Sequence, residues 1–295
     1  MDHLERLAGA LGRHLHVRGT ERLLRALYPC SPAAKRFVRG VRARNDGLLM
    51  DLDSRSWIDW NLLFRGDYEP HMTKLWGRLA PEGGVAIDVG ANIGAHTLSM
   101  ARAVGARGRV LAFEPNPLVR SALARNVALN TLTQVTVYAC ALGSGPGTLP
   151  LRVPKAGSDD FANMGLASLV ALETPHDLVD VEIRSLDDVL AEQPAERVDV
   201  IKIDVQGYEM ETLRGMRGCL ERHRPVIVFE YDAWAWKQAD ASPEDAFAAL
   251  HAAGYELFKM DNRARVDPQP IVGGTPLPAF VDLLAIHAGS PDWRS

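Results

Sequence analysis

The sequence has few of the features that mark disulfide-rich, nucleic-acid-binding or membrane-spanning proteins. Its 295 residues include only 3 cysteines, and because these are far apart and form no C-x-x-C pair, we expect neither a disulfide framework nor a structural zinc site. The formal net charge of -4 gives no overall attraction to nucleic acid. No apolar run reaches the roughly 20 residues that span a bilayer, and no secretory signal opens the chain. These absences predict a cytoplasmic protein with no membrane span and no nucleic-acid partner.

The sequence does have the composition and rhythm of an α/β domain. Hydrophobic residues make up 47% of it, and its length suits one large domain with a small addition. From Pro81 onward, short apolar runs alternate with helical segments, and GSGPGTLPLRVP interrupts this rhythm as a hairpin or loop. The expected strands are VAIDVG, RVLAFEP, VTVYACAL, VDVIKIDV, PVIVFEY, YELFKM and FVDLLAIH. This alternation predicts an α/β fold with a mostly parallel sheet and helices on both faces.

A helical extension is expected over residues 1–80, ahead of the α/β domain of residues 81–295. The first 45 residues are rich in arginine, and we favour a solvated helical face over a surface for an anionic partner or a membrane. Trp57 and Trp60 recur at helical spacing, which favours a core position over a place in a lid. The extension as a whole is interpreted as a substrate lid or as the contact of a homodimer.

The segment VAIDVGANIGAHTL places Gly90 and Gly94 at a strand-to-helix turn. It differs from the dinucleotide-binding G-x-G-x-x-G, because Asn92 stands where the backbone would approach a pyrophosphate. Asp88 would oppose a phosphate but favour a cation, directly or through water. A bare tight turn explains the glycines but not Asp88 with Asn92. These features suit S-adenosylmethionine, which has an ammonium, a sulfonium and a carboxylate but no phosphate. We expect Asp88, Gly90, Asn92, Gly94 and Thr97 to bind this cofactor.

An acidic residue at the end of the next strand supports the same cofactor. Glu114 ends RVLAFEP, and a carboxylate at this place can accept hydrogen bonds from both hydroxyls of a ribose. Asn116 follows it and can cap the next helix. The third strand ends near Ala141, where we expect backbone contacts to the adenine edge. Glu114, Asn116 and Ala141 are therefore added to the predicted cofactor contacts.

With these features in place, the sequence resembles the FkbM-type methyltransferases, a branch of the class I S-adenosylmethionine-dependent fold, over roughly residues 83–232. The resemblance rests on IDVGANIGAHTL, VLAFEPNP, NVALN, SLDDVL, VDVIKIDVQGYEMETLRGM and PVIVFEY. It implies a Rossmann-like class I methyltransferase fold and O-methylation of a hydroxyl on a sugar, glycolipid or secondary metabolite. Relatives have an N-x-G-x-x-S segment similar to the one here, which implies that Asn163 and Ser168 fold over the cofactor. Many relatives have Glu where this chain has Gln206, so one carboxylate is missing.

Two acidic residues are candidates for the chemistry. Asp204 and Glu230 end the fourth and fifth strands, and both should face one crevice because the carboxyl ends of parallel strands meet at the same edge. A hydroxyl is a poor nucleophile, so a general base or a metal usually assists its methylation. Asp204 is the first candidate for that base, and the alternatives are a metal ligand or a helix cap. Glu230 could complete an acid/base pair or half of a metal site, and we favour catalysis without a metal. His96 is expected to be packed or to face solvent.

Two other functions fit parts of the sequence. A protein or RNA methyltransferase would share the cofactor turn, but the N/D-P-P-Y/F signature of N-methylating enzymes is absent, and DVQG stands in its place. A nucleotide-binding module without methyl transfer would share the fold. We therefore expect a small-molecule hydroxyl acceptor, bound by residues 1–80 and 150–180, whose identity the sequence does not encode in a readable motif.

Overall fold

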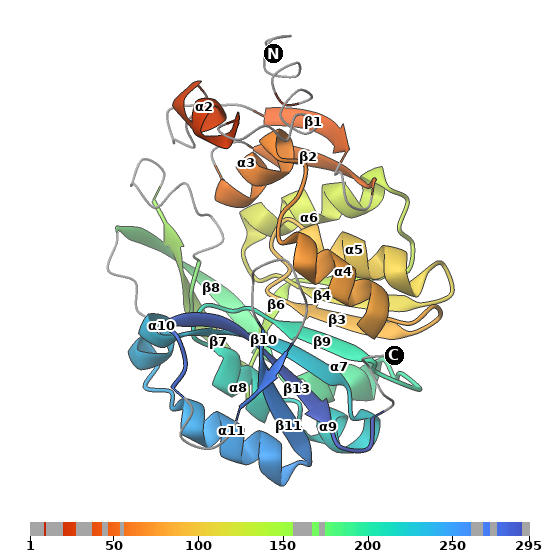
Figure 1. The fold of residues 1–295 in the computed structure, drawn as a ribbon. Helices are drawn as coiled ribbons and strands as arrows, with labels where there is room; N and C mark the ends of the chain where they lie inside the picture. Colours follow the sequence, from red (N-terminus) through yellow and green to blue (C-terminus); the bar gives the residue numbers. More distant parts are fainter. Residues whose placement is uncertain are drawn as a thin grey trace.

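The computed structural model of the chain describes residue 9 and residues 20–27, 37–42, 47–53, 56–155, 167–170, 175–260, 268–271 and 276–290. At its centre is an eight-stranded sheet in the order β12-β11-β13-β10-β9-β3-β4-β5 (Figure 1). Strands β10, β9, β3, β4 and β5 are parallel, whereas β13 runs antiparallel to β10 and β11, and β12 antiparallel to β11. The strands are β3 (Val85–Val89), β4 (Arg109–Phe113), β5 (Val135–Tyr138), β9 (Val200–Ile203), β10 (Val226–Asp232), β11 (Tyr255–Lys259), β12 (Gln269–Pro270) and β13 (Phe280–His287). The predicted α/β fold with a mostly parallel sheet is confirmed.

Helices cover both faces of this sheet. On one face α4 (Pro70–Leu79), α5 (Ala95–Val104) and α6 (Pro117–Leu129) pack on the side chains that include Ala86, Val110 and Ala112. On the other face α7 (Leu186–Glu192), α8 (Glu209–Arg214), α9 (Arg217–His223) and α11 (Pro243–Ala252) pack on those that include Ile87 and Ile201. The short helix α10 (Ala233–Gln238) directly follows β10. All five residues of β3 are buried as a result, which accounts for its unbroken apolar run up to Asp88.

The segment VTVYACAL, predicted as one strand, is divided between two sheets. β5 pairs with β4 as far as Tyr138, which lies opposite Phe113, the last residue of β4. Because β4 ends at this pair, the next strand, β6 (Cys140–Leu142), pairs instead with β8 (His176–Arg184). β8 also pairs antiparallel with β7 (Gly147–Pro154), which completes a small sheet in the order β6-β8-β7. The segment GSGPGTLPLRVP was expected to be a hairpin or a loop, and its residues Gly147–Pro154 form the strand β7.

The N-terminal region contains two strands besides the expected helices α2 (Thr20–Leu27) and α3 (Trp57–Phe64). β1 (Phe37–Arg42) and β2 (Leu49–Asp53) form an antiparallel ribbon that the sequence analysis did not predict. Side-chain amides of α6 complete the pairing of β2: Asn126 Oδ1 accepts a hydrogen bond from the Asp51 N–H at 2.7 Å, and Asn130 Oδ1 accepts one from the Leu49 N–H at 2.8 Å. These partners lie more than 70 residues away in sequence, so the residues of β2 and their neighbours do not by themselves indicate a strand.

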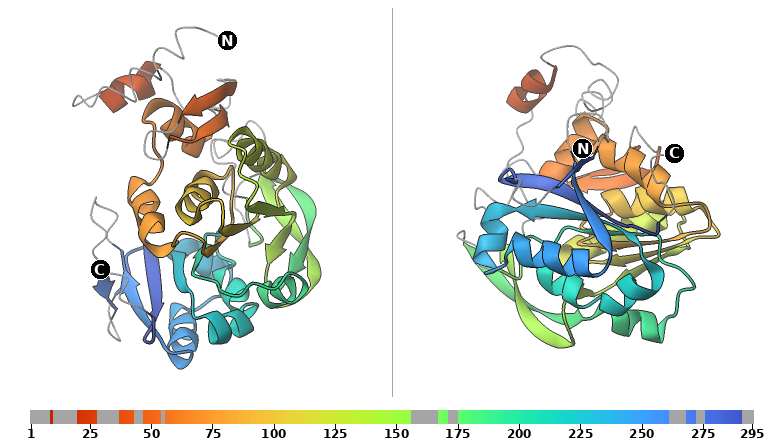
Figure 2. Two further views of the ribbon diagram at one scale, coloured as in Figure 1. Left: turned by 90° about the vertical axis from the view of Figure 1, so that its right-hand side faces the viewer. Right: turned by 60° about the horizontal axis from the view of Figure 1, so that its bottom comes forward.

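The N-terminal residues share a core with the glycine turn, α5 and α6. Trp60 is 1% exposed and belongs to a cluster that also contains Ile93 and Leu98. Trp57 is half-buried, and its ring stacks on that of Trp60 with centroids 5.8 Å apart. The core interpretation is therefore confirmed for Trp60, whereas Trp57 borders the cavity described below. Figure 2 shows this part of the chain beside α6. Within the ranges described above, no helix is long and apolar enough to cross a membrane. The division at residue 80 and the lid or dimer role stay predictions.

Candidate functional site

The glycine turn lies between β3 and α5, at the centre of the sheet, where β3 is flanked by β4 and β9. Gly90 and Gly94 have φ angles of +77° and +97°, which favour glycine. A Cβ at position 90 would lie 1.9 Å from the backbone oxygen of Asp204, so only glycine lets the two loops meet. Asn92 is also left-handed, with φ 51°, and its Oδ1 accepts a hydrogen bond from the Ile93 N–H at 2.8 Å. Gly90, Asn92 and Gly94, which the sequence pointed to, thus give the turn its left-handed backbone.

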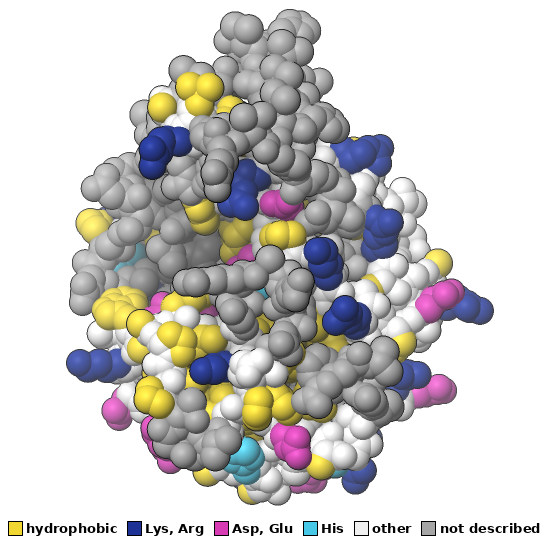
Figure 3. All heavy atoms as spheres, in the orientation of Figure 1, with side chains coloured by type: hydrophobic (Ala, Val, Ile, Leu, Met, Phe, Trp, Pro, Cys, Tyr) yellow, Lys and Arg dark blue, Asp and Glu magenta, His cyan; other side chains and the backbone are white. Residues whose placement is uncertain are grey.

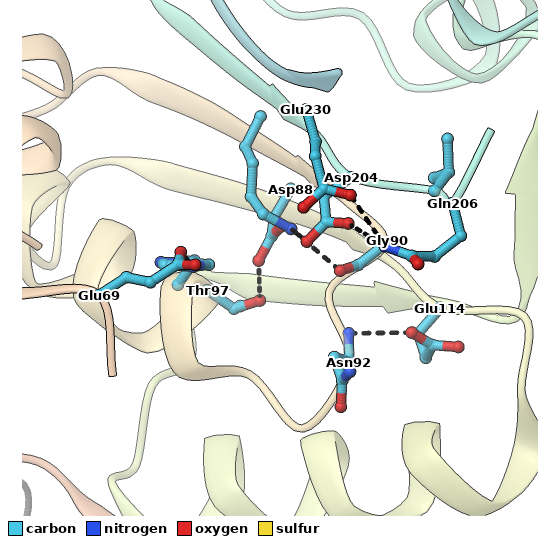
Figure 4. Close-up of polar contacts among 12 residues, drawn as sticks. Glu69, Asp88, Gly90, Asn92, Thr97, Glu114, Asp204, Gln206 and Glu230 are labelled. Atoms are coloured by element: carbon cyan, nitrogen blue, oxygen red, sulfur yellow. Dashed lines mark hydrogen bonds and ion pairs between the residues drawn. The ribbon is translucent and has the colours of Figure 1, made fainter. Parts of the chain in front are cut away.

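Asp88 and Thr97 lie beneath the turn rather than in a cavity. Both are fully buried, and Asp88 Oδ2 accepts a hydrogen bond from Thr97 Oγ1 at 2.5 Å (Figure 4). Asp88 Oδ1 lies 3.3 Å from the ammonium of Lys202, which also donates to the Gly90 carbonyl at 3.1 Å. Neither residue lines the cavity, and both support the turn from within the protein. That Asp88 favours a cationic ligand, directly or through water, and that Thr97 binds the cofactor stay predictions.

Lys202 is a site residue that the sequence analysis missed. It lies on β9, is 5% exposed, and has its ammonium 3.5 Å from Asp204 Oδ2 as well as close to Asp88. Burial disfavours the ammonium, but Asp88 and Asp204 outweigh burial and raise the pKa of Lys202 above its usual value. The lysine inside the apolar run VDVIKID could have indicated this role, because a lysine on a buried strand needs an acidic partner nearby.

Glu114 joins the two turns that follow β3 and β4. Its Oε2 accepts a hydrogen bond from the Asn92 N–H at 2.9 Å, and its Oε1 accepts one from the Asn116 N–H at 2.8 Å. The residue is 8% exposed, and burial raises its pKa to about 7 despite these two bonds. Asn116 is buried and caps α6 by accepting a hydrogen bond from the Leu118 N–H at 3.1 Å, so the predicted cap is confirmed. Glu114 lines the cavity, whereas Asn116 does not.

The two candidate carboxylates meet across a bridging amide. Asp204 follows β9, Glu230 lies two residues before the end of β10, and Gln206 Nε2 donates to Asp204 Oδ1 at 3.1 Å and to Glu230 Oε2 at 2.9 Å (Figure 4). Burial, followed by the charge of Asp204, raises the pKa of Glu230 well above its usual value. The side chain of Asp204 is 35% exposed, so this carboxylate remains open to a ligand. The expectation that the two acids share one crevice is confirmed.

A cavity of about 250 Å³ connects these groups. One wall contains Gly90, Asn92, Glu114 and Ala141, and another contains Asp204, Gln206 and Glu230. Aromatic side chains complete the lining, and acidic groups lie next to hydrophobic ones in the recess on this face (Figure 3). The aromatic lining residues are Trp57, Tyr68, Tyr208 and Phe280. A ligand held by the glycine turn would therefore also face the carboxylate pair.

The remaining predicted residues are placed as follows. Ser168 is buried and donates from Oγ to the Gln206 carbonyl at 2.8 Å, so it supports the loop after β9 while its neighbours Ala167 and Leu169 line the cavity. Asn163 lies outside the described residues. His96 is packed, as expected: its Nδ1 accepts from Trp76 Nε1 at 3.2 Å, and its Nε2 lies 3.1 Å from Glu69 Oε2. Over the residues that the structure describes, no cluster of three or more His, Cys, Asp or Glu side chains is arranged to hold a metal ion.

Known proteins match the same part of the chain. The sequence profile of the methyltransferase FkbM domain matches residues 88–257. The chain is 35% identical over 214 residues to the methyltransferase sdnD of Sordaria araneosa, covering 61% of this chain and 76% of that protein. It is 29% identical over 154 residues to the hexuronic acid methyltransferase AglP of Haloferax volcanii, covering 50% of this chain and 56% of that protein.

The solved structures that resemble the chain are more distant. Methyltransferase FkbM from Methylobacillus flagellatus is 16% identical with a TM-score of 0.43, over 95% of this chain and 58% of that one. Fibrillarin from Aeropyrum pernix, with bound S-adenosylmethionine, is 14% identical with a TM-score of 0.41, over 70% of this chain and 68% of that one. The match of the family profile to more than half of the chain determines the assignment: the chain belongs to the FkbM family of S-adenosylmethionine-dependent methyltransferases.

Proposed function

We propose that the protein transfers the methyl group of S-adenosylmethionine to a hydroxyl of a small molecule, namely a sugar, a glycolipid or a secondary metabolite. One observation carries the proposal: the glycine turn with Glu114 and the carboxylate pair Asp204–Glu230 line the same cavity. A cofactor seated on the turn and a hydroxyl seated at the pair would be neighbours, which is the alignment that methyl transfer requires.

The wall formed by the glycine turn fits the cofactor. Gly90 leaves the backbone accessible because it has no side chain, and Glu114 keeps lone pairs on both oxygens after accepting the hydrogen bonds of Asn92 and Asn116. We assign these lone pairs to the ribose hydroxyls. Ala141 also lines the cavity, and we assign the part of the cavity beside it to the adenine. When bound, S-adenosylmethionine supplies the electrophilic methyl group.

The two carboxylates are proposed to have different roles. The Asp204 carboxylate has the Lys202 ammonium 3.5 Å away and its side chain is 35% exposed, so we assign it as the base that accepts the hydroxyl proton. The pKa of Glu230 is raised by burial and by Asp204, which favours its neutral form. A neutral Glu230 can donate a hydrogen bond to the acceptor and so orient it. The similarity to a hexuronic acid methyltransferase supports a sugar among the candidate acceptors.

The experiment has a binding arm and a transfer arm. Calorimetric titration should show that the protein binds S-adenosylhomocysteine and does not bind NAD, because the turn lacks the glycine spacing of dinucleotide-binding proteins. Transfer from radiolabelled S-adenosylmethionine should then be measured with neutral hexoses, hexuronic acids and hydroxylated metabolites. Tight NAD binding without S-adenosylhomocysteine binding would remove the methyl-transfer proposal, and labelling of protein or RNA alone would replace the small-molecule acceptor.

The role of Asp204 is tested with the same assay. Asp204→Asn keeps the size of the side chain but cannot accept a proton, so turnover should fall by on the order of a hundredfold while S-adenosylhomocysteine still binds. Glu182→Gln changes an exposed acid on β8 and serves as the matched control. Activity should survive a chelator. Loss of activity with chelator and recovery with magnesium would instead make Asp204 a metal ligand, and a near-normal rate in Asp204→Asn would leave it a structural residue. A cytoplasmic location and a homodimer remain predictions.

A further inference from the structure

The loop after β9 has an unusual backbone that must be held in place. Gln206 has a φ of 54° and Gly207 a φ of 98°, so two consecutive residues are left-handed. Gln206 has a side chain, and a residue of this kind adopts such a φ only when its surroundings enforce it. Gly207 is also confined, because a Cβ there would lie 2.7 Å from the Ala235 backbone oxygen. The loop therefore presents Gln206 in one specific orientation.

Glu209, at the start of α8, supplies the contacts that enforce this backbone. Its Oε1 accepts hydrogen bonds from the Val205 N–H at 3.0 Å and from the Gly207 N–H at 3.3 Å. These two amides lie on either side of Gln206 in the chain, so one oxygen spans the left-handed residue. Glu209 is 1% exposed, and its Oε2 has no hydrogen-bond partner among the residues described. Burial of a carboxylate with a single engaged oxygen is costly, and it calls for an explanation.

The geometry of the site provides that explanation. The Gln206 side-chain amide is the shared donor of Asp204 and Glu230, and both of its hydrogens are used by these two carboxylates. If the loop relaxed to an ordinary backbone, this amide would leave the pair. The hydrogen bonds through which one loop residue fixes Asp204 and Glu230 relative to each other would then be lost. The relative placement of Asp204 and Glu230 thus depends on Glu209, which acts on them through the backbone of the loop.

We propose that Glu209 is a positioning residue of the methyl-transfer reaction, acting by holding Gln206 in the conformation that bridges Asp204 and Glu230. The proposal rests on the proposed function, because it gives the Asp204–Glu230 pair its importance. Glu209 does not line the cavity, so its influence passes through the loop and not through contact with an acceptor.

The first test follows the Gln206 amide itself and needs no acceptor. Its two side-chain protons can be identified in a proton–nitrogen NMR spectrum by their loss in Gln206→Met. In the wild type these protons should exchange slowly with water. In Glu209→Leu they should exchange at least tenfold faster and move toward the shifts of an exposed glutamine. Glu209→Gln should restore them, because one amide oxygen can accept both backbone hydrogen bonds. Glu211→Gln, two residues along α8, is the matched control and should change nothing.

The second test measures the consequence for the reaction. With an acceptor found by the transfer assay, Glu209→Leu should lower kcat about tenfold or more while S-adenosylhomocysteine affinity stays within about threefold, and Glu209→Gln should recover kcat. An unchanged Gln206 signal in Glu209→Leu would overturn the proposal, and so would a displaced signal with an unchanged kcat. If Glu209→Leu does not fold, Glu209→Asp takes its place, because the shorter side chain cannot span both amides. Failure of the proposed function can be told apart from failure of the Glu209 proposal. In the first case the wild type would show no methyl transfer, while the NMR signals of Gln206 would still depend on Glu209.

Discussion

The affinity for S-adenosylhomocysteine should fall as the pH is lowered through about 7, because Glu114 has a raised pKa of about 7 and is proposed to accept hydrogen bonds from the ribose. Hydroxyl donors favour the ionised carboxylate, so the complex should hold fewer protons on Glu114 than the free protein does. Affinity should consequently be fully developed above pH 7 and decline below it.

The size of the effect follows from the same pKa. If the ligand binds only the ionised form, the apparent dissociation constant is multiplied by one plus ten to the power of the pKa minus the pH. With a pKa of about 7 this factor is about 11 at pH 6 and about 1.1 at pH 8, so affinity should change about tenfold, or about 1.4 kcal/mol. This is an upper value, because a protonated carboxyl still has one oxygen that can accept a hydrogen bond.

Calorimetric titrations of S-adenosylhomocysteine at pH 6, 7 and 8 would measure this dependence. Glu114→Gln is the reference, because it is uncharged throughout and should bind about tenfold or more weakly at pH 8. Other groups titrate in this range, including Glu209, and they contribute equally to both proteins. The difference between wild type and variant therefore isolates Glu114. Parallel pH profiles in two folded proteins would refute the ribose assignment.

Three further substitutions test parts of the site and its support. Gly90→Ala would place a Cβ 1.9 Å from a backbone oxygen, so we expect urea denaturation to show a loss of about 2 kcal/mol or more and calorimetry to show at least tenfold weaker cofactor binding. Burial raises the pKa of Glu209 from 4.5 to about 7, so the wild type loses folding stability as the pH rises and this buried group ionises. The free energy of unfolding of Glu209→Gln should therefore rise relative to the wild type by up to about 3 kcal/mol between pH 5 and pH 9. Urea denaturation at both pH values would show this, and a difference that stays constant with pH would contradict it. Asn126→Ala should cost about 1–3 kcal/mol in the same measurement, since it leaves the Asp51 N–H and the Ile93 carbonyl without their partner, and a silent change would show that water replaces the amide.

The sequence by itself determined where the candidate site lies. Gly90, Glu114, Asp204 and Glu230 were expected at the carboxyl ends of parallel strands, and all four line one cavity. The reason is geometric: alternation of strands with helices makes neighbouring strands parallel, and this places the residues at their carboxyl ends along one edge of the sheet. Turn chemistry is equally local, because the left-handed φ at Gly90 depends mainly on the residue type at that position.

Tertiary structure decided which of these side chains face the cavity and what holds them. Asp88 and Thr97 stand next to the predicted turn, yet both are buried beneath it, because the ammonium of Lys202 arrives there from a strand more than 100 residues away. The end of β5 and the pairing of β2 also depend on distant partners. Periodicity and turn residues are properties of neighbours in the chain, whereas the free energy of a buried polar group depends on whichever partner packing brings within hydrogen-bonding distance. That is why the amide bridge of Gln206, and the buried carboxylate of Glu209 beneath it, became visible only in the folded protein.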